Sequence, residues 1–168
     1  MSGRTALPAL DLRAYCEADL ESVRALHALA FESLAADLHS REQLAAHTAM
    51  TQSDAYAADL RASHLTLAIG TAGRVAATAG WIAVADEAAT ARIRKVFVHP
   101  DLARRGLASL LVRDAEARAR AHGYRRIIVR ANLNAVPLYA KLGYRTLQES
   151  GMAAGNGIVL PVHYMEKT

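Results

Sequence analysis

The sequence is poor in cysteine and lacks any long apolar run. Its one cysteine, Cys16, cannot form an internal disulfide, which fits a reducing compartment. No apolar stretch is long enough to cross a bilayer as a helix. Residues 1–10 also lack the basic start, apolar core and cleavage site of a secretory signal. We therefore expect a cytoplasmic protein with no membrane partner.

Two further absences concern ligands. The histidines of the N-terminal half are scattered over segments expected to be helix and loop, so we expect no metal. These residues are His27, His39, His47 and His64. The basic part of the chain has no interleaved aromatic residues and no recognised reader motif, so we expect no nucleic-acid partner. With 168 residues, 52% of them hydrophobic and 21% charged, the chain is predicted to form one domain, 1–168, with 1–9 as a loose leader.

Positive charge is what the sequence has in excess. The net charge is +4, and many of the arginines fall between residues 92 and 130. A basic surface attracts anions, so nucleic acid and a phosphorylated cofactor are both candidates before motifs are considered, beside a plain solvated surface. The arginines are Arg92, Arg94, Arg104, Arg105, Arg113, Arg118, Arg120, Arg125, Arg126 and Arg130.

Hydrophobic periodicity predicts alternating strands and helices along the chain. Strands are expected at 10–15, 64–69, 74–84, 91–98, 124–131, 144–148 and 158–166. Helices are expected at 19–30, from residue 41 onward, within 51–63, at 107–122 and at 134–142. We expect Ser40 and Asn134 to cap helices, Gly80 to mark a bulge, and a glycine-rich connection at 151–157.

The stretch 96–112 combines a buried strand, a basic loop and an amphipathic helix. The first N–H groups of a helix have no intrahelical acceptor and lie at the positive end of the helix dipole, so they can hold a phosphate. Gly106 and Ala108 would let a phosphate approach this backbone, and Arg104 and Arg105 would add charge. The spacing alone leaves open the alternative of a plain turn with its arginines in water.

The segment 93–111, IRKVFVHPDLARRGLASLL, resembles the acetyl-CoA motif of the GNAT superfamily of N-acetyltransferases. That motif is usually Arg or Gln, two residues, Gly, one residue, then Gly or Ala. Gly106 and Ala108 match its small positions. The leading Arg or Gln falls on Ala103, and Arg104 stands where many members have glycine. In the family the pyrophosphate contacts are mostly main-chain, so the resemblance implies that this departure removes a side-chain contact and leaves the site in place.

A second segment, 132–144 or NLNAVPLYAKLGY, resembles the Asn…Ala…Tyr-x-x-x-Gly-Phe/Tyr segment of the same family. With a final strand at 160–167, the resemblance covers roughly residues 10–166. It implies an α/β (α+β) fold with a mixed, mostly antiparallel sheet of about six or seven strands and helices on both faces. It also implies that the sheet is splayed between strands 4 and 5, where the pantetheine arm lies.

The resemblance implies the site residues and the reaction. An acetyl group would pass from the cosubstrate acetyl-CoA directly to a primary amine, with Tyr139 as the general acid and an N–H near Val96 polarising the thioester. The cofactor-binding residues carried over are Val96, Phe97, Val98, Arg104, Arg105, Gly106, Leu107, Ala108, Ser109, Asn132 and Tyr139.

The sequence does not assign the general base, the acceptor or the oligomeric state. No carboxylate occurs on the strand 91–98, so the general base is not assigned among Asp86, Glu87, His99, His163 and Glu149. Trp81, Tyr56 and Tyr164 would line an acceptor pocket or pack in the core. The acceptor is a small molecule or a protein amine, and a homodimer is compatible with the resemblance. A non-catalytic module that binds acyl-CoA is the alternative function.

Overall fold

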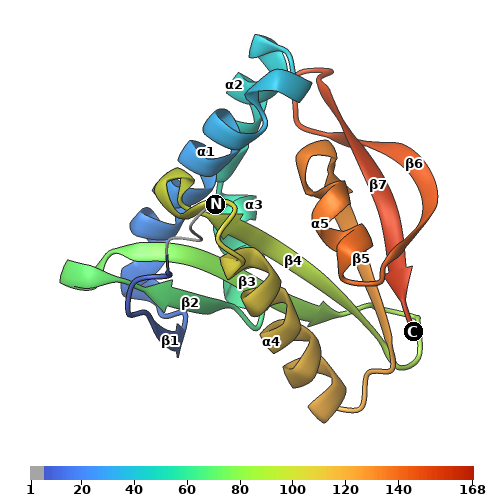
Figure 1. The fold of residues 1–168 in the computed structure, drawn as a ribbon. Coiled ribbons are helices and arrows are strands. Elements are labelled where there is room, and N and C mark those ends of the chain that lie inside the picture. Colours follow the sequence, from blue (N-terminus) through green and yellow to red (C-terminus); the bar gives the residue numbers. More distant parts are fainter. Residues whose placement is uncertain (1–5) are drawn as a thin grey trace, which may run out of the picture.

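The computed structural model describes residues 6–168, which form a seven-stranded sheet with helices on both faces (Figure 1). The sheet order is β1-β2-β3-β4-β5-β7-β6. The strands are β1 (Asp11–Ala14), β2 (Thr66–Ile69), β3 (Val75–Ala83), β4 (Thr90–Val98), β5 (Arg126–Asn132), β6 (Arg145–Ala153) and β7 (Val159–Lys167). The α-helices are α1 (Leu20–Leu34), α2 (Arg41–Thr51), α3 (Asp54–Ala62), α4 (Leu107–Ala121) and α5 (Val136–Lys141).

The sheet opens between β4 and β5. These two strands form the one parallel pair among the described strands, and all other pairs are antiparallel. Their pairing runs from Thr90 opposite Arg126 to Ile93 opposite Val129 and then stops. β4 nevertheless continues along β3 to Val98, and β5 continues along β7 to Asn132. The expected mixed sheet, splayed between its fourth and fifth strands, is confirmed.

The two faces of the sheet carry separate cores, because successive side chains of a strand point to opposite faces. Leu67 of β2 packs in a cluster with α1 and α3, which includes Val23 and Leu60. The next residue, Ala68, packs in a cluster with Leu111 of α4. The α1–α3 helices therefore cover one face and α4 covers the other. α5 shares a further cluster with α4 over β4 and β5.

β4 carries a bulge just beyond the point of divergence. Thr78 pairs with Phe97 and Gly80 with Arg94, so Lys95 and Val96 together oppose one residue of β3. Lys95 has φ +57°, in the left-handed region. The irregularity expected at Gly80 is confirmed, but the extra residue belongs to β4.

Local signals at helix ends were partly right. Ser40 accepts a hydrogen bond from the Gln43 N–H at 3.1 Å, as expected of a cap. The cap expected at Asn134 is wrong. Helix α5 begins after Ala135, which makes no side-chain cap, and the buried Oδ1 of Asn134 has no partner. A short 3-10 turn at Leu133–Ala135 moves the start of the helix past the asparagine.

Two other boundaries differ from expectation. β6 runs to Ala153, so the glycine-rich connection is shorter than the expected 151–157, and Gly151 lies in the strand opposite Pro161. Of the expected leader, residues 1–5 lie outside the described residues. Residues 6–10 form no helix or strand, and Leu7 and Leu10 pack against the α4 cluster. Within residues 6–168, none of the helices is long and apolar enough to span a membrane.

Candidate active site

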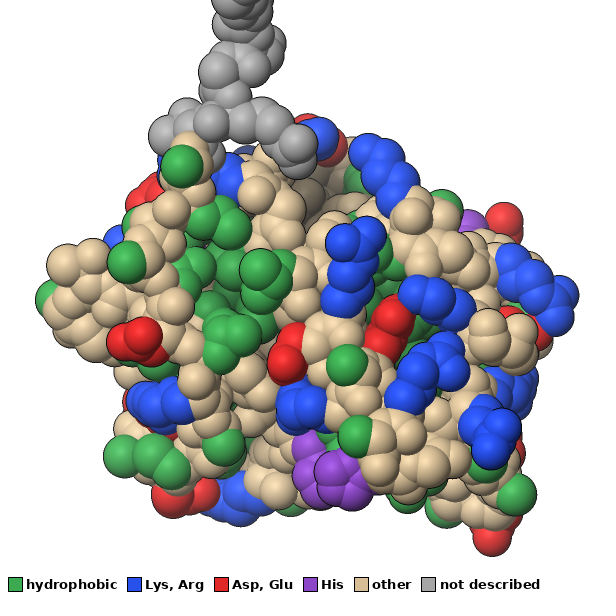
Figure 2. Space-filling view, turned by 60° about the horizontal axis from the view of Figure 1, so that its bottom comes forward, with side chains coloured by type: hydrophobic (Ala, Val, Ile, Leu, Met, Phe, Trp, Pro, Cys, Tyr) green, Lys and Arg blue, Asp and Glu red, His purple; other side chains and the backbone are tan. Residues whose placement is uncertain are grey.

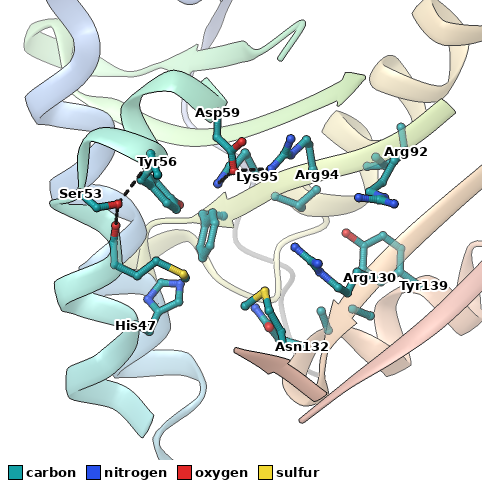
Figure 3. Close-up of a pocket in the computed structure, with 18 residues that line it drawn as sticks. His47, Ser53, Tyr56, Asp59, Arg92, Arg94, Lys95, Arg130, Asn132 and Tyr139 are labelled. Carbon is teal, nitrogen blue, oxygen red and sulfur yellow. Dashed lines mark hydrogen bonds and ion pairs between the residues drawn. The ribbon is translucent and has the colours of Figure 1, made fainter. Parts of the chain in front are cut away.

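A cavity of about 260 Å³ lies where β4 and β5 separate (Figure 3). Its walls come from β4, β5, the helices α2, α3 and α5, and one residue of β6. Four of the residues expected to bind cofactor line it: Val96, Phe97, Asn132 and Tyr139. The place where the sheet loses its ladder is therefore hollow, and the edge of β4 beyond Ile93 has no strand beside it.

The remaining expected cofactor residues follow β4 at the start of α4. Val98 and Leu107 are buried in the core beside Leu111, so their side chains hold the strand end against the helix. The rest of the group occupies the loop and first helical turn, partly or fully exposed: Arg104, Arg105, Gly106, Ala108 and Ser109.

Gly106 is the N-cap of α4 with φ +85°, and no side chain caps the helix. A Cβ at this position would have nothing within 4 Å, so the space in front of the first helical turn is open. Arg104 also has a left-handed backbone, with φ +61°. Glycine, which many members of the family have at this position, adopts this conformation without strain, whereas arginine adopts it at a cost in backbone conformational energy. The loop thus presents uncapped N–H groups to an open surface.

A buried chain of hydrogen bonds reaches the β4 bulge. The Thr78 hydroxyl donates to the Lys95 carbonyl at 2.6 Å and lies 2.7 Å from His27 Nε2. Because the one hydroxyl proton is used on the carbonyl, His27 Nε2 must carry a proton and donate. His27 Nδ1 then accepts from the Tyr56 hydroxyl at 2.7 Å. Burial holds the pKa of His27 well below its usual range, in keeping with this neutral tautomer.

Tyr139 is held in place by a second buried group. Its ring makes an edge contact with Tyr144, at 5.3 Å between centroids. The Tyr144 hydroxyl donates to Glu116 at 2.7 Å, and Lys167 donates to the other carboxylate oxygen at 2.9 Å. Burial, and then the charge of Glu116, raise the pKa of Tyr139. The Tyr139 phenol therefore stays protonated and can donate to an atom in the cavity.

The sequence did not reveal that the cavity is strongly basic. Its wall carries one carboxylate, Asp59 of α3, against four cationic side chains: Arg92, Arg94, Lys95 and Arg130. Arg94 donates to Asp59 at 2.6 Å, and Lys95 Nζ lies 3.5 Å from the same oxygen and 3.5 Å from the centre of the Tyr56 ring. Burial, and then the charge of Arg94, lower the pKa of Lys95 to about 8. The signal available in the sequence was the alternation Arg92, Arg94 on one strand.

None of the five residues left open as general base lines the cavity. His163 lies near Glu149, 3.9 Å away, and Glu87 pairs with Arg126 at 2.7 Å. Of the three aromatic residues considered for an acceptor pocket, Tyr56 lines the cavity, whereas Trp81 is buried in the core. Tyr164 does not reach the cavity wall.

The arginine-rich segment does not form one surface. Arg92, Arg94 and Arg130 line the cavity. Arg118 pairs with Asp114 within α4 at 2.8 Å, and Arg126 pairs with two carboxylates. Figure 2 shows a face on which Lys and Arg side chains gather toward one half with acidic side chains among them. Within residues 6–168, no three His, Cys, Asp or Glu side chains are grouped so as to hold a metal ion.

The whole fold is similar to those of solved N-acetyltransferases. A GCN5-related N-acetyltransferase from Rhodopseudomonas palustris is 28% identical, with 99% of each chain covered and a TM-score of 0.85. The PaiA N-acetyltransferase of Thermoplasma acidophilum, solved with coenzyme A, is 14% identical over 95% of this chain and 98% of that one, with a TM-score of 0.74. YncA of Salmonella typhimurium, solved with its cofactor acetyl-CoA, is 19% identical, with 95% and 93% covered and a TM-score of 0.64.

The family follows from the sequence itself. The model of the acetyltransferase (GNAT) domain matches residues 35–167, so the chain belongs to the GNAT acetyltransferase family. No curated protein matches the chain in sequence. The two segments that resembled family motifs both fall within the matched range, and the cavity lies between them.

Proposed function

We propose that the protein transfers an acetyl group from acetyl-CoA to a primary amine in the cavity between β4 and β5. One observation carries the proposal. The cavity has an unpaired strand edge at Val96 on one wall and the protonated hydroxyl of Tyr139 on another, and β4 leads directly into the uncapped start of α4.

Acetyl-CoA is the cosubstrate that suits this arrangement. The N–H groups at Gly106 and the following residues bind the diphosphate, with Arg104 and Arg105 adding charge beside them. The amide groups of the pantetheine arm pair with the free edge of β4 in place of a strand. PaiA and YncA, which share the fold, were solved with coenzyme A and acetyl-CoA, respectively, and this supports the same cosubstrate here.

The reaction then needs no covalent enzyme intermediate. The amine attacks the thioester carbon, the carbon–sulfur bond breaks, and the amine loses one proton while the departing thiolate gains one. A main-chain N–H at Val96 stabilises the oxyanion, and the Tyr139 hydroxyl donates to the sulfur as negative charge develops there. The bulge fixed by Thr78 sets the direction of the β4 groups. Holding the two substrates together supplies much of the acceleration.

Tyr139→Phe is the test of the catalytic role. We expect kcat to fall about a hundredfold, because the thiolate loses its donor, while the Kd for acetyl-CoA changes little. The readouts are free thiol released from acetyl-CoA with a panel of amines, and calorimetric titration of acetyl-CoA. Tyr124→Phe removes a hydroxyl outside the cavity and serves as the matched control. Tight binding of acetyl-CoA by the wild-type protein, with no thiol released with any amine, would instead indicate a non-catalytic acyl-CoA module.

A further inference from the structure

We propose that the acceptor carries an anionic group, a carboxylate or a phosphate, in addition to its amine, and that Arg92 and Arg130 bind this group. The inference rests on the proposed acetyl transfer and adds the substrate class. It starts from an imbalance in the cavity wall, where four cationic side chains face one carboxylate.

The single carboxylate, Asp59, already forms ion pairs with two of the four cations, Arg94 and Lys95. Asp59 accepts from Arg94 at 2.6 Å and lies 3.5 Å from Lys95 Nζ. The side chains of Arg94 and Lys95 are only 16% and 10% exposed, so both need this partner. Asp59 therefore has little capacity left for the other two arginines.

Arg92 and Arg130 make no hydrogen bond or ion pair with other side chains among residues 6–168, although both line the cavity. The Nε of Arg92 is buried without a partner, which is costly for a charged group. Burial, and then the charges of Arg130 and Arg94, lower the pKa of Arg92. Arg130 is exposed, so the unpartnered buried nitrogen belongs to Arg92 alone. An anion placed between the two guanidinium groups would supply the acceptor that Arg92 lacks and balance the charge of both, and a guanidinium fork suits both carboxylate and phosphate.

This anion is not the diphosphate of the cosubstrate. Arg92 lies on the paired part of β4, opposite Ile128, whereas the loop to Gly106 begins only after Val98. Arg92 and Val98 are six positions apart on β4, which corresponds to at most roughly 20 Å of extended strand, shortened by the bulge at Lys95. Val96 and the thioester site lie between these ends. The amine would thus react near Val96 while its anionic group points back along β4 toward Arg92.

The positive charge of the cavity wall also disfavours polyamines as acceptors. A polyamine would bring further positive charge to a wall that already has unpartnered cations, and like charges in a partly buried site repel strongly. We therefore expect polyamines to be poor acceptors. A cavity of about 260 Å³ suits a small acceptor such as an amino acid.

The test compares matched acceptors with and without the anionic group. α-Amino acids are assayed against their amides, and phosphoethanolamine against ethanolamine, by thiol release from acetyl-CoA. We expect kcat/KM to be at least about tenfold higher for the anionic member of one or both pairs, as for a hydrogen bond to a charged group. The first pair reports on carboxylate and the second on phosphate.

Variants tie the preference to the two arginines. Arg92→Gln and Arg130→Gln should raise KM for the anionic acceptor about tenfold or more and remove the preference, with the Kd for acetyl-CoA unchanged. Arg125→Gln, at an exposed arginine before β5, should keep the preference. Equal rates for anionic and neutral acceptors, a preference that survives both variants, or variants that weaken acetyl-CoA binding would each overturn the inference while leaving acetyl transfer intact. Absence of transfer to every amine would instead overturn the proposed function, and the inference with it.

Discussion

At the scale of the residue, Lys95 is the most unusual side chain of the cavity wall. Its ammonium group is enclosed by the Tyr56 ring, Asp59 and the neighbouring charge of Arg94, and its side chain is 10% exposed. Burial and Arg94 lower its pKa from 10.5 to about 8, against the opposing effect of Asp59. The folded chain therefore releases this proton at a lower pH than the unfolded chain does.

This difference predicts a pH-dependent stability. Below pH 8 both states hold the proton and the folded state carries the full cost of the buried charge. Between pH 8 and 10.5 unfolding takes up a proton, so Lys95 becomes less destabilising as pH rises. Relative to Lys95→Met, the free energy of unfolding of the wild-type protein should rise by up to about 3 kcal/mol across this range, measured by urea unfolding. Lys141→Met, at an exposed lysine of α5, should show no such difference. Parallel curves for wild type and Lys95→Met would contradict this account of Lys95.

At the scale of the element, β4 contributes more residues to the cavity wall than any other strand or helix. Its first half pairs with β5, its bulge faces the cavity, and its end leads into α4. The hydrogen bond from Thr78 to the Lys95 carbonyl fixes the bulge from the neighbouring strand. Thr78→Val removes that donor and leaves both the carbonyl and His27 Nε2 unpaired in the core.

We expect Thr78→Val to lower the free energy of unfolding by about 1–3 kcal/mol. It should also reduce kcat more than it raises KM for acetyl-CoA, because the bulge no longer holds the Val96 N–H at the thioester. Thermal unfolding and steady-state kinetics measure the two effects. Thr90→Val, which removes the bond to the Ala88 carbonyl at the far end of β4, should leave kcat close to wild type. A full kcat in Thr78→Val would mean that the bulge does not position the reacting group.

The same strand shows how far a sequence can be read. Apolar alternation and turn residues predict β4 and its neighbours, and the small residues Gly106 and Ala108 predict the cofactor loop, because these signals are local. The cap expected at Asn134 is wrong because a 3-10 turn at Leu133–Ala135 precedes the helix, which starts only at Val136. The basic cavity was not predicted because Asp59 and Arg130 meet β4 only through the fold, more than 30 residues away in the chain.

At the scale of the whole molecule, the two sides of the sheet contribute different residues to the cavity. On the side of α1–α3, Tyr56 and Asp59 line the cavity, and His27 hydrogen-bonds to Tyr56. On the side of α4 and α5, Tyr139 lines the cavity, and α4 packs on the sheet with its first turn directly after the loop that ends at Gly106. The cavity is lined from both sides of the sheet where β4 and β5 part (Figure 3). Acetyl-CoA binding at the start of α4 is the claim on which acetyl transfer depends.

The two ends of α4 offer a direct measurement of that claim. Gly106 and Gly123 have φ of +85° and +93°, and a Cβ at either would have nothing within 4 Å. Alanine at either position should therefore cost a similar amount, about 1–2 kcal/mol of stability. In calorimetric titrations with acetyl-CoA, Gly106→Ala should bind at least about tenfold more weakly than wild type, because its Cβ occupies the open space in front of the helix. Gly123→Ala should bind as wild type does. No uptake of acetyl-CoA by the folded wild-type protein, or equal affinity in both variants, would contradict the account.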